Sequence, residues 1–178
     1  CGGMDLGFLG GFDYREYSFP KTGFEVVFAN DFDADAASVY KKNFKYLGSK
    51  HFHFGDIREV DAESIPDFDI LLAGFPCQPF SNAGNRQGVN DKSGRGTLFY
   101  ECERIIKHCK KKSDGALPKV FVFENVKGIL SSKMPDGMTV PEEIALKMSR
   151  LGYKTSTMLI KTSEYVVPQN RQSVMIVG

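Results

Sequence analysis

An α/β fold, with a mostly parallel sheet and helices on both faces, is predicted by the alternation of two kinds of segment along the 178-residue chain. Short apolar runs have the continuous hydrophobicity of strands that are buried on both faces. Between them lie longer stretches whose apolar residues recur at helical spacing. In open sheets of this kind ligands bind at the carboxyl ends of the strands, so the residues that follow each apolar run are the first candidates for function.

The predicted strands and helices alternate in order along the chain. Strands are expected at residues 25–29, 51–54, 68–73, 119–123 and 173–177. Helices are expected at residues 34–44, 98–112 and 142–151. No internal repeat, low-complexity tract or domain boundary interrupts this alternation, so residues 1–178 are predicted to form one domain.

Composition limits the class of protein. A hydrophobic content of 42% is enough for one sizeable core. The sequence has no apolar run near the ~18 residues of a membrane span and no export signal, so a soluble, cytoplasmic protein is expected. The net charge of +1 gives no global signature of a polyanion partner, so nucleic-acid binding has to be argued from local features.

The four cysteines and three histidines do not have the spacing of metal ligands. Reduced thiols and no bound metal are therefore expected. The cysteines are Cys1, Cys77, Cys102 and Cys109.

Cys77 stands in the most distinctive local motif, GFPCQPFS at residues 74–81. A proline on either side of Cys77-Gln78 stiffens the backbone and would present the thiol at the end of a strand. A nucleophilic thiol needs a positive or hydrogen-bonding neighbour, and Arg171 is a candidate by residue type. The alternative is a structural cysteine that fills the core.

Residues 81–96 are rich in Gly, Asn and Ser and form a loop longer than the roughly 12–15 residues at which structureless loops become uncommon. Arg86, Lys92 and Arg95 outnumber the single acid Asp91, so the loop is locally basic. That charge favours a loop that closes over phosphates, and a merely solvated loop is the alternative.

Acidic residues follow three of the apolar runs. Asp31 could accept the ribose hydroxyls of a nucleoside cofactor or cap the helix at 34–44. Asp56 could accept an adenine amino group while Phe32 and Ile57 sandwich the ring, or it could be an ordinary turn residue beside ordinary core residues. Glu124, at the end of the run at 119–123, could donate a proton or cap a helix.

The glycine pair Gly2-Gly3 would let the backbone approach a ligand closely, and it would serve a helix-entry turn equally well.

The motif GFPCQPFS resembles the nucleophile motif of cytosine-5 DNA methyltransferases, and eight consecutive positions fit. Other segments resemble this family's motifs in the family's order, over nearly the whole chain. These segments are residues 1–8 (CGGMDLGF), 30–33 (NDFD), 55–57 (GDI), 94–99 (GRGTLF), 124–126 (ENV) and 169–171 (QNR).

This resemblance implies a Rossmann-like, S-adenosylmethionine-dependent fold and a DNA-modifying enzyme of the bacterial restriction–modification type. Cys77 would add to carbon-6 of a cytosine flipped out of double-stranded DNA, Glu124 would hydrogen-bond the ring, and Arg171 would complete the catalytic set. Carbon-5 would then take the methyl group, leaving S-adenosylhomocysteine. The implied cofactor-binding residues are Gly2, Gly3, Asp31, Phe32, Asp56, Ile57, Gly74, Pro76 and Leu98. The implied substrate-binding residues are Phe75, Gln78, Ser81, Asn125, Val126, Arg86 and Arg95.

Two departures from the family pattern bear on activity. Ser173 stands where the family usually has a second arginine, which contacts the target base and the catalytic glutamate. The sequence also stops at Gly178, where the family continues into a target-recognition region, so a second chain or a further segment is expected to supply recognition.

Three alternatives remain open. A transfer-RNA cytosine methyltransferase usually has proline at the position of Phe75 and threonine at that of Ser81, so this sequence favours DNA. A catalytically silent module that binds cofactor or a partner is the second alternative. A thiol redox or hydrolytic enzyme built on Cys77 is the third, and no resolving cysteine or histidine is positioned for it.

Overall fold

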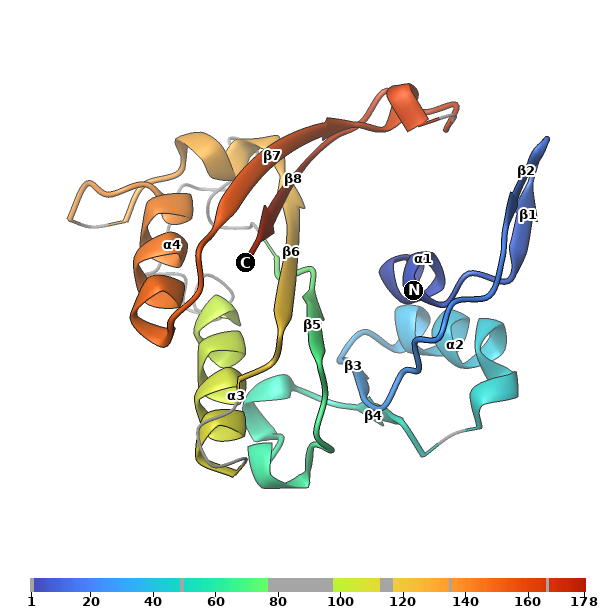
Figure 1. Cartoon of the computed structure of the whole chain (residues 1–178), viewed down its shortest axis with the longest axis horizontal. Coiled ribbons are helices and arrows are strands. Elements are labelled where there is room, and N and C mark those ends of the chain that lie inside the picture. The colour runs from blue at the N-terminus through green and yellow to red at the C-terminus, as the bar shows by residue number, and fades with distance from the viewer. Residues whose placement is uncertain (1, 49, 77–97, 113–116, 135, 166) are drawn as a thin grey trace. The chain divides into compact units, whose positions relative to one another are not determined.

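The computed structural model describes residues 2–48, 50–76, 98–112, 117–134, 136–165 and 167–178 (Figure 1). The chain divides into two compact units, an N-terminal unit of Cys1–Phe68 and a C-terminal unit of Asp69–Gly178. Each unit has its own sheet and helices.

The N-terminal unit contains two helices and two small sheets. Helix α1 spans Gly3–Leu9 and α2 spans Ala34–Asn43. Strands β1 (Phe12–Tyr14) and β2 (Tyr17–Phe19) form an antiparallel hairpin, and β3 (Ala29–Asp31) pairs in parallel with β4 (Phe52–Phe54). Short 3₁₀ turns cover Lys45–Leu47, Ile57–Glu59 and Ala62–Ser64.

Strand β3 begins later than the sequence predicts. The expected strand at residues 25–29 is confirmed only at Ala29, and the observed strand runs on to Asp31. The partner strand explains the shift, because β4 begins at Phe52 and the chain turns at Lys50 and His51. The ladder therefore starts where the Ala29 amide donates to the His51 carbonyl, at 2.8 Å.

The C-terminal unit contains a four-stranded sheet in the order β5-β6-β8-β7. Its strands are β5 (Ile70–Ala73), β6 (Val120–Val126), β7 (Ser156–Lys161) and β8 (Gln172–Val177). Its α-helices are α3 (Leu98–Lys112) and α4 (Val140–Leu151), with 3₁₀ turns at Lys127–Ser131 and Thr162–Tyr165.

The α/β class is confirmed, but the sheet of the C-terminal unit is mixed rather than mostly parallel. Strands β5 and β6 pair in parallel, whereas β8 is antiparallel to both β6 and β7. The antiparallel pairs arise because the connection from β7 to β8 is short, too short for the crossover that parallel strands need.

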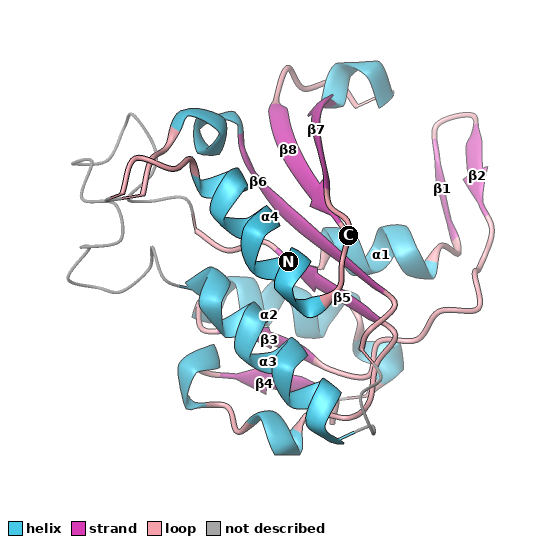
Figure 2. Ribbon diagram, turned by 60° about the vertical axis from the view of Figure 1, so that its left-hand side comes forward, coloured by secondary structure: helices cyan, strands magenta, loops and turns pink. Residues whose placement is uncertain are grey.

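The core of this unit lies between α3, α4 and one face of the sheet (Figure 2). Side chains alternate along β6, so Phe121 and Phe123 point into the core while their neighbours point away. Val174 of β8 and Ile144 of α4 are fully buried against them. This packing fixes β6 and β8 side by side; Glu124 lies in β6, and Arg171 directly precedes β8.

Helix α4 starts two residues before the predicted bound of 142 because its N-terminus is capped. The Thr139 hydroxyl and the Glu142 carboxylate form a reciprocal capping box, and Pro141 stands in the first turn. Gly152, in the left-handed region, ends the helix.

Candidate active site

The segment that leads to Cys77 leaves the end of β5 and is anchored in the core. The Phe75 ring is buried, and its centroid lies 5.8 Å from that of Phe123 and 6.2 Å from that of Phe99. Gly74 and Pro76 flank it, and Leu98 is the first residue of α3. Five predicted site residues, Cys77, Gln78, Ser81, Arg86 and Arg95, lie outside the described residues.

Asn125 connects this segment to the neighbouring strand. Its side chain, 4% exposed, donates from Nδ2 to the Phe75 carbonyl at 3.0 Å. Its Oδ1 accepts from the Val126 amide at 2.9 Å. Since Phe75 comes two residues before Cys77 in the chain, Asn125 fixes the backbone that leads to the predicted nucleophile.

Glu124 forms an ion pair with Arg171. Arg171 Nη2 lies 3.3 Å from Glu124 Oε1, and the side chains are 49% and 25% exposed, respectively. The sequence predicted both as catalytic residues but could not place them together, because 47 positions separate them. The antiparallel pairing of β6 with β8 brings the Glu124 and Arg171 side chains into contact.

Glu124 and Asn125 lie within β6 rather than after a strand that ends at residue 123. The parallel pairing with β5 ends at Phe123, where the predicted strand ends, but the pairing with β8 continues to Val126 opposite Ser173. Successive side chains of a strand point to opposite faces, so Asn125 faces the core and Glu124 the other face.

In the N-terminal unit the carboxyl ends of β3 and β4 are joined by hydrogen bonds. Asn30 Nδ2 donates to the carbonyls of His53 (3.2 Å) and Gly55 (2.9 Å). The Gly55 amide donates to the Asp31 carbonyl at 3.1 Å. Two candidate cofactor residues, Asp31 and Asp56, therefore follow adjacent parallel strands at one edge of this small sheet.

The N-cap of α2 is Asp33, not Asp31, so the capping alternative for Asp31 is wrong. Asp33 Oδ1 accepts from the Ala36 amide at 2.8 Å. Asp31 Oδ1 accepts from the Asp33 amide at 3.0 Å, which orients its carboxylate at the strand end. Phe32, between them, is 61% exposed, so its ring is accessible to a ligand.

Asp56 caps the 3₁₀ turn Ile57–Glu59 and pairs with Arg58. Its Oδ1 accepts from the Arg58 amide at 2.9 Å, and the Arg58 Nε lies 3.0 and 2.9 Å from the two carboxylate oxygens. These hydrogen bonds, first those from the Arg58 side chain, lower the pKa of Asp56. The carboxylate therefore stays an acceptor at neutral pH. Ile57, next to it, is half-buried.

Gly2 serves a helix-entry turn. It is the N-cap of α1 with a φ of 79°, and a Cβ there would lie 2.2 Å from Phe44 Cε2. Glycine is needed because the left-handed backbone and the aromatic neighbour both exclude a side chain. A Cβ on Gly3, by contrast, would meet no atom of the described residues within 4 Å.

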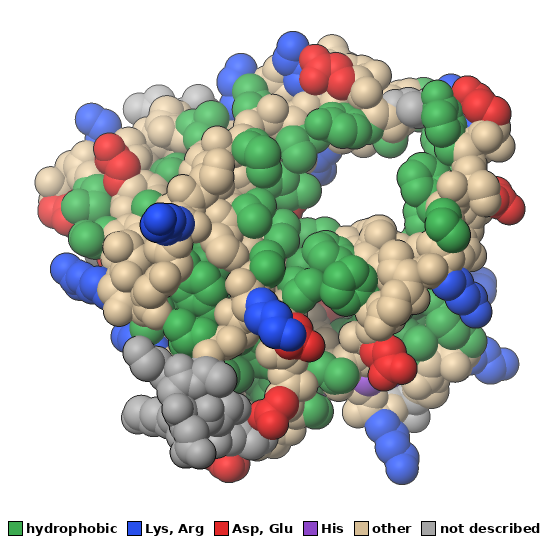
Figure 3. All heavy atoms as spheres, viewed as in Figure 1, with side chains coloured by type: hydrophobic (Ala, Val, Ile, Leu, Met, Phe, Trp, Pro, Cys, Tyr) green, Lys and Arg blue, Asp and Glu red, His purple; other side chains and the backbone are tan. Residues whose placement is uncertain are grey.

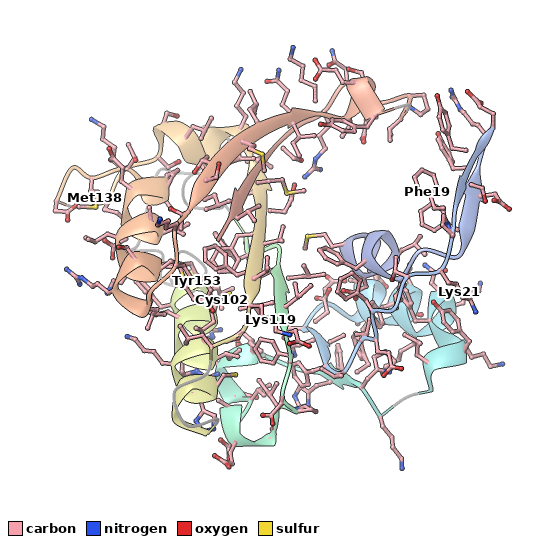
Figure 4. The ribbon with its side chains drawn as sticks, in the orientation of Figure 1. Phe19, Lys21, Cys102, Lys119, Met138 and Tyr153 are labelled. Carbon is pink, nitrogen blue, oxygen red and sulfur yellow. The ribbon has the colours of Figure 1, made fainter. Side chains whose placement is uncertain are left out.

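Cys102 is not a candidate nucleophile. It is buried in the core on α3, and burial raises the pKa of its thiol to about 12 (Figure 4). Within the described residues, no group of three or more His, Cys, Asp or Glu side chains could hold a metal ion.

No helix in the described part of the chain is both long and apolar enough to cross a membrane. On the face seen in Figure 3, basic and acidic side chains are interspersed, in keeping with the net charge of +1.

Two residues, Ser173 and Thr162, form hydrogen bonds with Arg171 that the sequence did not predict. Arg171 Nε donates to Ser173 Oγ at 3.2 Å, and the Arg171 amide donates to Thr162 Oγ1 at 3.1 Å. Ser173 stood out in the sequence only as a departure from the family pattern. Thr162 carries no local signal, because its contact depends on the turn between β7 and β8.

Comparison with known proteins gives consistent matches. The family model described as C-5 cytosine-specific DNA methylase matches residues 2–178. The chain is 42% identical over 154 residues to Type II methyltransferase M.BanI from Aneurinibacillus aneurinilyticus, which covers 86% of this chain and 32% of that protein. It is 40% identical over 160 residues to Type II methyltransferase M.HaeII from Haemophilus aegyptius, which covers 90% of this chain and 45% of that protein. The chain thus spans less than half the length of these curated relatives.

A solved structure shares the fold. The S. pombe Dnmt2 methyltransferase superposes with a TM-score of 0.58 at 21% identity, covering 86% of this chain and 42% of that one. This likeness supports an α/β methyltransferase fold.

Proposed function

Because this chain belongs to the C-5 cytosine-specific DNA methylase family, we propose that it transfers a methyl group to carbon-5 of a cytosine in double-stranded DNA. Two adjacent side chains of β6 carry the proposal. Glu124 is paired with Arg171, and Asn125 holds the backbone that leads to Cys77. This strand carries an acidic side chain and fixes the backbone that leads to a thiol. Such an arrangement supports a reaction in which the thiol bonds covalently to a nucleobase.

In the proposed reaction the Cys77 thiolate adds to carbon-6 of the ring. Glu124 hydrogen-bonds ring nitrogen 3 and the amino group; it passes its proton to nitrogen 3 as the electron-rich ring forms and takes it back when the aromatic ring is restored. Carbon-5 then attacks the methyl group supplied by S-adenosylmethionine. Removal of the carbon-5 proton and loss of Cys77 restore the aromatic ring. The cytosine has to leave the stack first, at a cost of a few kcal/mol.

For the cofactor, the carboxyl ends of β3 and β4 offer hydrogen-bond acceptors of the right chemistry. Asp31 would accept the ribose hydroxyls, as acids at this position do in dinucleotide folds. Asp56 would accept the adenine amino group, with Phe32 and Ile57 on either side of the ring. The bonds from Asn30 to His53 and Gly55 support this assignment because they hold the two strand ends together.

We further propose that residues 1–178 act as one catalytic and cofactor-binding domain in the cytoplasm, in support of host protection against a restriction enzyme. The family match covers both units, and the relatives are named Type II methyltransferases. Recognition of the DNA sequence would come from a further segment or a second chain.

The assay that tests this proposal measures labelled methyl transfer in the longest natural form of the protein. Double-stranded DNA of varied sequence and transfer RNA are offered in parallel, and products are identified as 5-methylcytosine by mass spectrometry. We expect product in DNA only. Product in transfer RNA alone would show that the substrate is transfer RNA and not DNA. Cofactor binding without product in either polymer would indicate a catalytically silent module.

A further inference from the structure

Four groups of Arg171 are hydrogen-bonded, and one of them contacts Glu124. Its amide donates to Thr162 Oγ1 at 3.1 Å, and its carbonyl accepts from the Thr162 amide at 3.0 Å. Its Nε donates to Ser173 Oγ at 3.2 Å, and its Nη2 donates to Glu124 Oε1 at 3.3 Å. Thr162 thus fixes the backbone, and Ser173 and Glu124 fix the guanidinium plane.

Strand register explains why Ser173 can do this. Val126 lies opposite Ser173, and Glu124 lies opposite Met175, so all four side chains share one face of the β6–β8 pair. Glu124 and Ser173 are diagonal neighbours, and residues in this relation are roughly 7–8 Å apart. One guanidinium group fills such a gap, with a different nitrogen on each partner. A long side chain at position 173 would occupy the same space.

The Ser173 hydroxyl can help to hold the Arg171 side chain in one geometry. Ser173 is only 7% exposed, whereas Arg171 is about half exposed. An exposed arginine loses much side-chain freedom when it is held in one geometry, and a surface ion pair alone rarely offsets that loss. The buried hydroxyl supplies a second, charge-assisted hydrogen bond at a fixed point of the sheet.

We propose that Ser173 is a positioning residue that holds the guanidinium of Arg171 against Glu124 for methyl transfer. This role rests on the proposed function. It accounts for the serine that stands where the family has a second arginine, because the serine hydroxyl orients Arg171. Thr162 supports the same arrangement through the Arg171 backbone.

The test compares Ser173→Ala and Ser173→Thr with Ser156→Ala, a control at an exposed serine of β7. In the longest natural form of the protein we expect Ser173→Ala to lower kcat about tenfold, the range for losing a hydrogen bond to a charged group. KM for DNA should change less than about twofold, because the contacts that bind DNA equally in the ground state and the transition state are retained. Ser173→Thr keeps the hydroxyl on a strand that accepts a β-branched residue, so it should restore most of kcat.

A double-mutant cycle shows whether Ser173 acts through Arg171. In an Arg171→Ala background, Ser173→Ala should cause no further loss of kcat. An equal tenfold loss in both backgrounds would overturn the proposal, as would a loss that Ser173→Thr does not reverse.

A measurement without turnover separates this proposal from the proposed function. The Arg171 Nε proton should exchange with water more slowly in the wild-type chain than in Ser173→Ala, as read by nitrogen-15 NMR. A wild-type chain without methyl transfer would refute the proposed function. Equal exchange rates in the two chains would refute the positioning role.

Discussion

Replacing Glu124 with glutamine is expected to lower the rate of methyl transfer by about 10²–10⁴-fold, the range for a group that transfers a proton in the transition state. Glutamine keeps the shape of the side chain but lacks the ionisable proton and the charge that pairs with Arg171. The fold should survive, because the side chain faces away from the core on β6. Single-turnover transfer at saturating cofactor measures the effect.

The matched control for this change is Glu16→Gln, at an exposed glutamate in the turn between β1 and β2. This variant should transfer methyl groups at the wild-type rate. If Glu124→Gln also stayed within about threefold of wild type, Glu124 would not be the acid of the reaction and the role assigned to β6 would be wrong.

Replacing Asn125 with alanine is expected to lower the free energy of unfolding by about 2–3 kcal/mol and to slow methyl transfer more than tenfold. The change removes the partners of the Phe75 carbonyl and the Val126 amide. A buried polar group that is left without a partner costs about 1–3 kcal/mol. Urea unfolding gives the stability, and single-turnover rates well below the unfolding midpoint give the effect on the reaction.

Asn43→Ala provides the comparison, since Asn43 is an exposed residue in the last turn of α2. It should change stability by less than about 0.5 kcal/mol, as surface substitutions usually do. An Asn125→Ala protein that is less stable but reacts at the wild-type rate would show that the Phe75 hydrogen bond stabilises the fold without serving the reaction.

Helices α2, α3 and α4 could be predicted closely because their signal is local, whereas α1 was not predicted. The apolar spacing at 98–112 matches the bounds of α3, and the prediction at 34–44 exceeds α2 by one residue. The strands at 68–73 and 173–177 were found within two residues, since both are continuous apolar runs.

Elements that depend on exposed or distant partners were missed. Strand β7 is an edge strand with mostly exposed side chains, so it lacks the continuous apolar run that identified the others. The β1–β2 hairpin is likewise largely exposed. Both are set by pairing, which the sequence pattern does not record.

In the candidate site, too, some features could be predicted from the sequence and others could not. The residue types and their order predicted Glu124 and Arg171 as catalytic, but only the β6–β8 pairing brings them to 3.3 Å. The contact of Ser173 with Arg171 follows from the same register. The catalytic roles of these residues stay predictions, and the contact between them could not be predicted because it depends on hydrogen bonds between strands.

The central claim, that Cys77 is the nucleophile, is tested most directly with DNA that contains 5-fluorocytosine. Fluorine at carbon-5 cannot leave as a proton, so the final elimination is blocked and the enzyme stays bonded to the base. With S-adenosylmethionine present, we expect mass spectrometry to find a covalent adduct on Cys77. The adduct should persist in Cys109→Ala and vanish in Cys77→Ala. An adduct on another residue, or methylated cytosine in ordinary DNA formed by the Cys77→Ala protein, would contradict the account.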